Sequence, residues 1–455
     1  MTVEIIPAGL AKAESEASKL LTWDPENPVF WEKTAAKLAK RTLWITTAAL
    51  TLSFATWFVW SAVIVRLPEL GFPLSVSQRF MLTALPGFVG ATLRIPYSFI
   101  VQIFGTRRVV AIATASLLIP SIGIGLAVQD PSTPYWVLLA LAASAGLGGG
   151  NFSAFMSSTS LFYPKARQGT ALGIQAGIGN FGVSIVQFLT PLIIGAGIFG
   201  PLGGKALIWS KAGVEKQLWI QNAAFFWAIP VVVVALLAAV YLRSIPVTAS
   251  LKDQAVIFRR KHTWVMTSLY FMTFGSFSGL AASFALLIRE VFGKLPGAPD
   301  PLRYAFLGAL IGSATRPLGG WISDKIGGAK VTMVSGAVMI LAAVGVMFFT
   351  SPTSMSEFVP FFAMMMLLFL ASGIGNGSTF RMIPVIFPRK EAAPVLGWTA
   401  AIAAYGFFIV PLCFGWSMGR FGSPNAAFGI FAGFYALNLL LCHWYYARKG
   451  AEIPC

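Results

Sequence analysis

The chain has 455 residues, of which 56% are hydrophobic and only 11% are charged, and its mean hydropathy is +0.75. A soluble domain carries roughly 25% charged residues, so this composition excludes an ordinary soluble protein. The net charge of +17 argues only weakly for nucleic-acid binding, because the basic residues are spread over many segments rather than gathered on one face. The sequence therefore predicts a polytopic membrane protein with no nucleic-acid partner.

Twelve apolar stretches follow the polar N-terminus. Each is close to the roughly 20 residues that an α-helix needs to cross a bilayer, whereas a transmembrane barrel would show short alternating segments. The predicted spans are 42–65, 78–103, 109–127, 135–160, 169–195 and 221–242, then 263–288, 304–322, 331–350, 359–386, 394–418 and 425–446. The predicted fold is an all-α membrane protein with two six-helix halves. Its parts are an N-terminal segment 1–41, a first bundle 42–242, a linker 243–262, a second bundle 263–446 and a tail 447–455.

The distribution of basic residues orients these spans. With the N-terminus in the cytoplasm, 21 of the 33 Lys and Arg fall in cytoplasmic segments, nine at the outer side and three within spans. This bias follows the positive-inside rule and places both termini and the basic linker in the cytoplasm. Residues 1–41 lack the apolar core of a signal peptide. Within them, the stretch from Pro28 to Arg41 fits either a short interfacial helix or a disordered tail.

The sequence offers no set of residues for a metal, a cofactor or a reaction centre. Cys413, Cys442 and Cys455 are scattered and lack the spacing of metal ligands. His262 and His443 fall at the ends of predicted spans rather than near their centres. We therefore expect no cofactor and no enzymatic activity.

Arg94 and Arg316 lie in the middle of apolar stretches, and no Asp or Glu is near either of them in the sequence. A guanidinium cannot lose its proton to ease its burial. Placing an arginine at the centre of a membrane helix costs about 2.5–3.5 kcal/mol on insertion scales. Two such residues without acidic partners suggest that a substrate anion supplies the missing negative charge.

An internal repeat relates the two arginines. Arg94 precedes Gly105 by 11 residues, and Arg316 precedes Gly327 by the same number. Eleven helical residues rise about 16 Å, roughly half of a 30 Å hydrocarbon core. Both arginines are therefore expected at the midplane on corresponding helices, where transporters bind their substrates. Arg381 lies close to the basic end of its span, and we expect a structural role for it.

Glycine is concentrated in two corresponding segments, 146–182 and 373–390, and nine of the 37 residues of the first are Gly. Glycines spaced by four form small-residue faces against which helices pack closely. The spacing predicts such faces at Gly146 and Gly150 and at Gly169, Gly173 and Gly177. We interpret the glycines as packing and hinge positions rather than ligands. The predicted hinge residues are Gly146, Gly150, Gly173, Gly177, Gly179, Gly373, Gly375 and Gly377.

These motifs carry a family resemblance. Gly320-x-x-x-Asp324-x-x-Gly327 resembles a loop motif of the major facilitator superfamily, and the first half keeps only Gly105 of it. The segments LTALPGFVGATLRIPYSF at 82–99, GLGGGNFSAF at 146–155, YFMTFGSF at 270–277 and GIGNGSTFR at 373–381 resemble those of the nitrate/nitrite porters, the NarK-type branch. The resemblance implies transport of nitrate and nitrite by a monomer in a bacterial inner membrane.

The resemblance also implies a binding site. The two arginines would clamp the planar anion from opposite faces, an amide and a hydroxyl would donate hydrogen bonds, and two aromatic rings would sandwich the anion. From spacing alone, a Phe within a span is usually a packing residue. The site residues that the resemblance implies are Arg94, Arg316, Asn180, Tyr270, Phe54 and Phe274.

The predicted coupling mechanism follows from the lack of titratable groups in the middle of the predicted spans. A proton symporter usually needs a titratable group within the membrane, and the sequence places none at depth. We therefore predict nitrate/nitrite antiport by a rocker-switch, in which the anion neutralises part of the positive site and permits the change of access. The alternatives are nitrate/proton symport and, from another class, a membrane-bound anion receptor that moves nothing.

Overall fold

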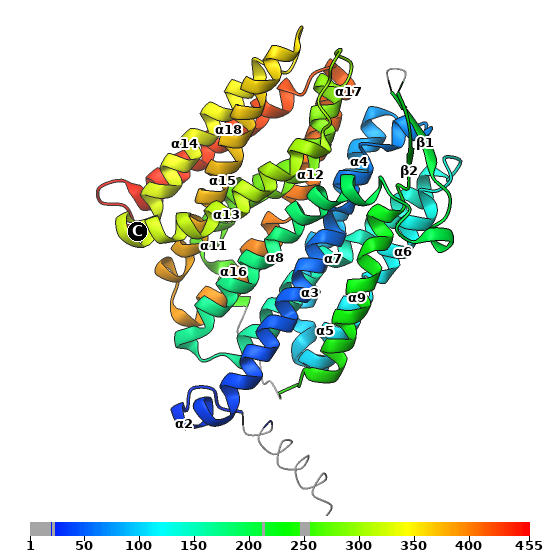
Figure 1. Cartoon of the computed structure of the whole chain (residues 1–455). Helices are drawn as coiled ribbons and strands as arrows, with labels where there is room; N and C mark the ends of the chain where they lie inside the picture. Colours follow the sequence, from blue (N-terminus) through cyan, green and yellow to red (C-terminus); the bar gives the residue numbers. More distant parts are fainter. Residues whose placement is uncertain (1–19, 21–22, 212–213, 246–254) are drawn as a thin grey trace, which may run out of the picture.

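The computed structural model describes residues 20, 23–211, 214–245 and 255–455. Long helices make up almost all of this part of the chain (Figure 1). Residues 1–19 and 21–22 of the predicted N-terminal segment and residues 246–254 of the basic linker lie outside the described residues. We call the part up to residue 245 the first half and the part from residue 255 the second half.

The described residues of the first half form seven helices of ten or more residues, one β-hairpin and short helical turns. The elements are α2 (Pro28–Phe30), η1 (Trp31–Ala35), α3 (Ala36–Val63), η2 (Leu67–Leu70), α4 (Val76–Phe104), α5 (Thr106–Ala115), α6 (Leu118–Ala127), α7 (Tyr135–Phe162), α8 (Lys165–Ile193), η3 (Gly200–Gly203), β1 (Leu207–Lys211), β2 (Val214–Leu218) and α9 (Asn222–Tyr241).

The second half has the same plan without a hairpin among its described residues. Its elements are η4 (Ala255–Arg259), α11 (Lys261–Tyr270), η5 (Phe271–Gly275), α12 (Ser276–Phe292), α13 (Leu302–Ile326), α14 (Gly328–Met347), η6 (Met355–Glu357), α15 (Phe358–Ile386), α16 (Arg389–Ala403), α17 (Gly406–Phe421), α18 (Asn425–Cys442) and η7 (His443–Ala447).

The predicted all-α membrane fold is confirmed. Eleven helical stretches of the described chain are long and apolar enough to cross a membrane. The helix α13 occupies the place of the remaining predicted span, but Arg303, Arg316, Asp324 and Lys325 lower its hydropathy. The protein is therefore a multi-pass membrane protein with twelve predicted crossings.

One local expectation is wrong, and two local features were not predicted. The first helix begins at Pro28 and continues to Val63, so residues 28–41 are neither a separate interfacial helix nor a disordered tail. The third span bends between α5 and α6, near Pro120, which has no N–H to donate to the backbone oxygen of Ser116. The long connection 196–220 contains the hairpin β1–β2, in which Trp209 pairs with Lys216.

The hairpin defines one end of the bundle, which we call the hairpin end. The opposite end carries α2 and the C-terminal Cys455, whose backbone oxygen accepts from Ala329 N at 3.0 Å. The two halves contact each other through α4 with α17 and through α8 with α13. At Gly87 of α4, an added Cβ would lie 2.6 Å from the carbonyl carbon of Phe407 of α17, so only glycine permits this approach.

The backbone confirms the internal repeat. The corresponding helices α4 and α13 end at Gly105 and Gly327, whose φ angles are +78° and +95°. Side chains rarely adopt this left-handed region, so both copies of the turn require glycine. The two halves are therefore built on the same local geometry, and Arg94 and Arg316 occupy corresponding places in it.

The close packing between Gly406 and Gly275 can be tested by substitution. An added Cβ at Gly406 would overlap the backbone of Gly275, whereas Gly433 of α18 has no neighbour within 4 Å among the described residues. We expect Gly406→Ala to lower the free energy of unfolding by about 1–3 kcal/mol, since overpacking forces backbone shifts. Gly433→Ala should have little effect. Thermal unfolding of both variants in detergent measures the difference, and equal midpoints would contradict this packing.

Candidate functional site

Arg94 lies in the middle of α4 and is completely buried. Its Nε donates to the backbone oxygen of Gly149 in α7 at 3.0 Å, and its Nη1 donates to that of Ala400 in α16 at 2.8 Å. Since α7 belongs to the first half and α16 to the second, this one side chain connects the halves. Nη2 is buried without an acceptor among the described residues, so the guanidinium retains donors for a ligand.

Three aromatic rings surround the Arg94 guanidinium. Its Cζ lies 4.5 Å from the ring centroid of Phe152, 5.3 Å from that of Trp57 and 5.7 Å from that of Phe274. The negative face of an aromatic ring attracts a cation. The rings thus stabilise the buried guanidinium, but they carry no formal charge and leave it un-neutralised.

Arg316 of α13 has a similar environment. It is 8% exposed, its Nη2 donates to the Tyr270 hydroxyl at 3.2 Å, and its Cζ lies 5.1 Å from the ring centroid of Phe380. Within the described parts of the chain, neither Arg316 nor Arg94 forms an ion pair. The absence of a neighbouring carboxylate, inferred from the sequence, thus extends to the tertiary structure of these residues.

Tyr270 and Phe274 join the two arginines into one cluster. Their rings stack with centroids 5.6 Å apart and an interplanar angle of 15°. Phe274 faces Arg94, and the Tyr270 hydroxyl contacts Arg316. The structure therefore brings together four of the six residues that were predicted to form the site.

A π-helical turn shapes this cluster. The turn η5 runs from Phe271 to Gly275 between α11 and α12, directly after Tyr270, and it contains Phe274. Such single π turns inside α-helices are frequent at functional sites, because the extra residue redirects the side chains that follow. Gly275 also permits the close approach of the backbone at Gly406. The position of the Phe274 ring relative to Tyr270 thus depends on local backbone geometry.

The two remaining predicted residues are Phe54, which lies close to the cluster, and Asn180, which forms no hydrogen bond with it among the described residues. Phe54 of α3 packs against Phe152 at 6.2 Å and against Trp57 at 5.5 Å, so it lies one ring away from Arg94. Asn180 of α8 is 2% exposed. No hydrogen bond of the described residues joins its amide to either arginine. The roles of Phe54 and Asn180 in binding stay predictions.

Three aromatic neighbours of the arginines were not predicted from the sequence, and these are Phe152, Phe380 and Trp57. Phe152 and Phe380 lie under Arg94 and Arg316, on the corresponding helices α7 and α15. Both residues stand within the glycine-rich segments, directly after Asn151 and directly before Arg381. Their place in the repeated motifs could have indicated that Phe152 and Phe380 belong to the site, whereas Trp57 lies in no such motif.

Most of the predicted glycine packing is present. An added Cβ would lie 2.6 Å from Val89 Cβ at Gly146, 2.7 Å from Leu93 Cβ at Gly150 and 2.7 Å from Leu50 at Gly179. Three glycines in the corresponding segment of the second half also pack tightly, and these are Gly373, Gly375 and Gly377.

The predicted packing face on the first part of α8 is not formed in this structure. The glycines of that face have no neighbour within 4 Å of an added Cβ among the described residues, and they are Gly169, Gly173 and Gly177. The spacing of four predicts a face that can pack, but it does not tell in which conformation the face has a partner.

Arg381 has the structural role that was expected. Its Nε forms an ion pair with Asp324 of α13, and both side chains are about half exposed. The pair connects α15 to the loop motif at the end of α13. Arg381 is therefore compensated by a carboxylate, unlike Arg94 and Arg316.

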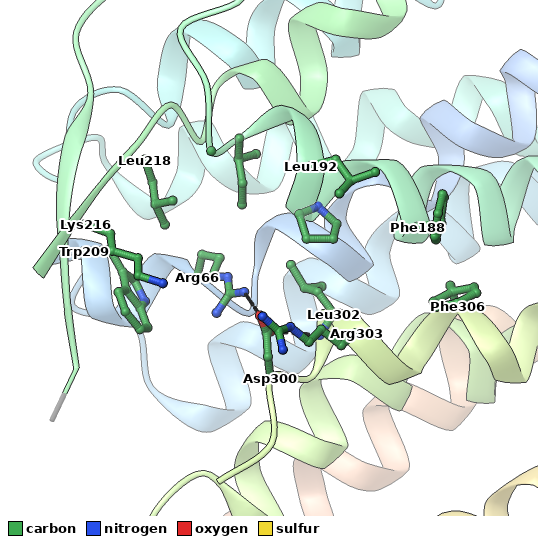
Figure 2. Close-up of a pocket in the computed structure, with 13 residues that line it drawn as sticks. Arg66, Phe188, Leu192, Trp209, Lys216, Leu218, Asp300, Leu302, Arg303 and Phe306 are labelled. Atoms are coloured by element: carbon green, nitrogen blue, oxygen red, sulfur yellow. Dashed lines mark hydrogen bonds and ion pairs between the residues drawn. The ribbon is translucent and has the colours of Figure 1, made fainter. Parts of the chain in front are cut away.

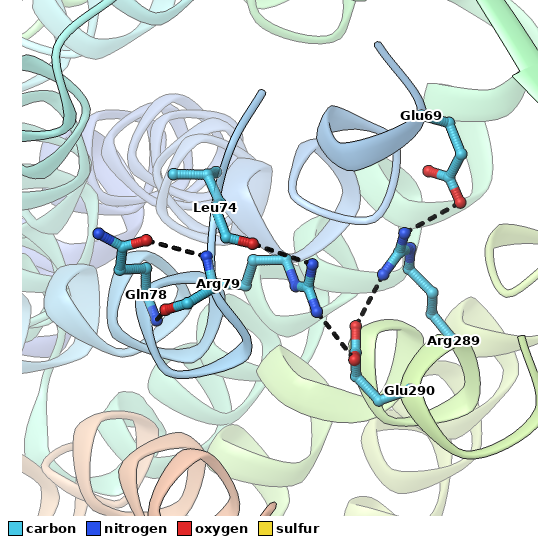
Figure 3. A network of polar contacts seen from close by, with 7 residues as sticks. Glu69, Leu74, Gln78, Arg79, Arg289 and Glu290 are labelled. Atoms are coloured by element: carbon cyan, nitrogen blue, oxygen red, sulfur yellow. Dashed lines mark hydrogen bonds and ion pairs between the residues drawn. The ribbon is translucent and has the colours of Figure 1, made fainter. Parts of the chain in front are cut away.

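Ion pairs connect the halves at the hairpin end (Figure 3). Arg79 of α4 contacts Glu290 of α12 at 2.9 Å, and Arg289 contacts Glu69 of η2 at 3.0 Å. Arg289 also contacts Glu290 at 2.8 Å, so the four side chains form one network. A further pair joins Arg66 to Asp300 at 2.7 Å. All ion pairs between the halves that the described residues form lie at this end, so the structure is closed there.

Residues 45–380 match the family described as the Major Facilitator Superfamily. The chain also superimposes on a bacterial homologue of the human lysosomal transporter Spinster, solved in an inward-facing and occupied conformation, with a TM-score of 0.66 and 18% identity over 87% of this chain and 95% of that one. Together with the repeated halves, these matches define the protein as a membrane transporter with the major facilitator fold, not an enzyme.

Two relatives identify the branch of this superfamily to which the chain belongs. The chain is 56% identical to a Thermus thermophilus protein named probable nitrate/nitrite antiporter NarK2, over 95% of this chain and 97% of that protein. It is 41% identical to the nitrate/nitrite transporter NarU of Escherichia coli K12, over 94% and 96%. The chain belongs to the NarK/NarU family of nitrate/nitrite transporters, which confirms the resemblance found in its motifs.

Proposed function

We propose that this protein exchanges nitrate and nitrite across a bacterial inner membrane, as a monomer without a cofactor, and that Arg94 and Arg316 hold the anion. The names of the relatives supply the substrates and, for one of them, the word antiporter. The observation that carries the proposal is the pair of buried guanidiniums without a carboxylate partner. A monovalent oxyanion supplies the charge and the acceptors that the cluster lacks.

The chemistry of the cluster suits a small planar anion. A guanidinium presents N–H donors in a rigid planar fork, which can donate to two oxygens of nitrate or nitrite at once. Arg94 contributes Nη2, and the Tyr270 hydroxyl can donate to the anion while it accepts from Arg316. The rings of Phe274 and Phe152 exclude water and strengthen these charge-assisted hydrogen bonds.

The same charges explain why exchange is favoured over unidirectional transport. Two un-neutralised guanidiniums in an empty site resist the dehydration that accompanies a change of access. One bound anion neutralises half of this charge and permits the change. Among the described residues, all Asp and Glu lie at the ends of the bundle or in its connections, so no carboxylate there offers a proton pathway at the depth of the arginines.

The proposed orientation follows from charge. With both termini in the cytoplasm, the hairpin end faces outward, and the ion pairs between Arg79, Arg289, Glu69 and Glu290 close the outer side. The rocker-switch then requires these pairs to break as the opposite end closes. The open glycine face on α8 lies toward that opposite end, and we propose that it packs against the second half in the other conformation.

Exchange is tested with purified protein in liposomes. We expect uptake of labelled nitrate only when the lumen contains nitrate or nitrite, because the empty carrier does not return. The rate should not respond to an imposed pH gradient at constant internal nitrite. Robust uptake into vesicles without either anion, driven by a pH gradient, would instead establish proton symport.

The arginine pair is tested by substitutions that keep the charge. Arg94→Lys and Arg316→Lys should each lower nitrate exchange by about 10- to 100-fold, since a lost charge-assisted hydrogen bond costs about 1.5–3 kcal/mol. Arg381→Lys is the matched control, because Arg381 pairs with Asp324 outside the cluster, and it should keep most activity. Exchange rates and nitrate affinities of the three variants are compared, and near-normal exchange by both cluster variants would remove the pair from the site.

The glycine face is tested by filling it. Gly173→Val and Gly177→Val should leave nitrate affinity unchanged but slow exchange at least severalfold, because the added methyl groups obstruct closure of the opposite end. Gly429→Val of α18 is the control, since this glycine is equally open but lies outside the glycine face on α8. Exchange at the same rate in all three variants would contradict a role of this face in closure.

A further inference from the structure

A cavity of about 420 Å³ lies at the hairpin end, between the two halves and away from the arginine pair (Figure 2). The hairpin β1–β2 and Arg66 form one side of it, α8 forms a second, and the start of α13 forms the third. The cavity is much larger than nitrate requires, and its wall is drawn from both halves. The proposed transport mechanism assigns no role to this cavity.

One side of the cavity is rich in positive charge. Arg66, Lys216 and Arg303 line it, and Asp300 is the single carboxylate among the lining residues. Asp300 is already paired with Nη2 of Arg66 at 2.7 Å. Lys216 and Arg303 are exposed and form no ion pair within the described residues. The site therefore carries a net charge of about two that is available to an anion.

Two buried donors also point to an anion. Nε of Arg66 and Nε1 of Trp209 have no acceptor among the described residues, although both atoms are buried. The two side chains lie together, with the Arg66 Cζ 5.8 Å from the centroid of the Trp209 ring. Buried donors in folded proteins nearly always have an acceptor. An oxyanion at this side of the cavity would provide acceptors for both.

The other side of the cavity is apolar and open to the membrane. Phe188 and Leu192 lie one turn apart on α8 and are 48% and 61% exposed. Phe188 packs edge-on against Phe306 of α13 with centroids 5.0 Å apart. In Figure 2 this pair of rings lies at the far side from Trp209 and Lys216. A ligand that fills the cavity thus has a negatively charged end and an apolar end.

The hairpin itself fits a position at the membrane surface. Its apolar side chains Ile208 and Val214 are 63% and 50% exposed, and Leu202 just before it is 96% exposed. Exposed apolar residues next to a Trp and basic side chains are typical of the headgroup layer, where Trp concentrates. Such a position of the hairpin would put the charged side of the cavity at the depth of the lipid phosphates.

We propose that this cavity is a binding site for an anionic phospholipid. Its phosphate would be held by Arg66, Lys216 and Arg303, and an acyl chain would lie along Phe188 and Leu192. Because the phosphate contacts both halves at the closed end, the bound lipid favours the conformation that is closed there. Lipid binding in this cavity requires neither a particular substrate nor a particular orientation of the hairpin end in the membrane.

The test measures lipid retention by the whole purified protein in detergent, by native mass spectrometry and by the thermal unfolding midpoint. The probes are phosphatidylglycerol and phosphatidylcholine with the same acyl chains, together with inorganic phosphate and glycerol phosphate as soluble anions. We expect phosphatidylglycerol to bind in preference to phosphatidylcholine, and the soluble anions to give no comparable protection.

Two double variants of equal charge change locate the site. Lys216→Ala with Arg303→Ala should weaken phosphatidylglycerol binding by roughly 30-fold, about fivefold for each cation removed from the membrane surface. Lys205→Ala with Lys294→Ala removes two exposed lysines that do not line the cavity, and it should leave binding unchanged. All four side chains are exposed, so both variants are expected to fold, and an unchanged thermal unfolding midpoint without added lipid verifies this.

Three results would overturn the proposal. Equal weakening by both double variants would reduce the effect to general surface charge. Protection by phosphate or glycerol phosphate equal to that by the lipid would make the site one for a free oxyanion. Equal retention of the two phospholipids would show that the cations of the cavity do not select a headgroup.

Discussion

The burial of two guanidiniums without carboxylates is the constraint on which the rest of the structure depends. Arg94 is held by backbone oxygens and aromatic faces, which satisfy part of its hydrogen bonding but none of its charge. Arg316 is held by a hydroxyl and a single ring. Among the described residues this charge has no neutralising partner, and in the proposed function a bound anion supplies it.

Glycines around this cluster allow the backbones of neighbouring helices to approach one another closely. The glycines of α7 allow α4 to approach until Arg94 reaches the oxygen of Gly149, and Gly275 and Gly406 do the same between α17 and the π turn. Each of these contacts would be blocked by one methyl group. The glycine-rich motifs thus allow close helix packing around the cluster, and in α7 this packing brings the Gly149 oxygen within reach of Arg94.

The charged residues at the hairpin end form ion pairs, whereas the two central arginines do not among the described residues. At the hairpin end, arginines and carboxylates pair across the halves and close the protein without a ligand. In the middle, positive charge is left without a partner. The paired charges connect the halves in this conformation, and in the proposed exchange the unpaired charges make the change of access depend on the bound anion.

The sequence by itself determined the membrane class, the twelve predicted crossings, the family and the two central arginines, because hydropathy, charge and repeated motifs are local properties of a chain. Tertiary structure alone decided which rings lie under Arg94, that residues 28–41 extend the first helix, and that Gly173 and Gly177 have no partner in this conformation. It also decided which of the outer charges pair with one another. These features depend on contacts between residues that are far apart in the chain, and a periodicity or a motif does not specify such contacts.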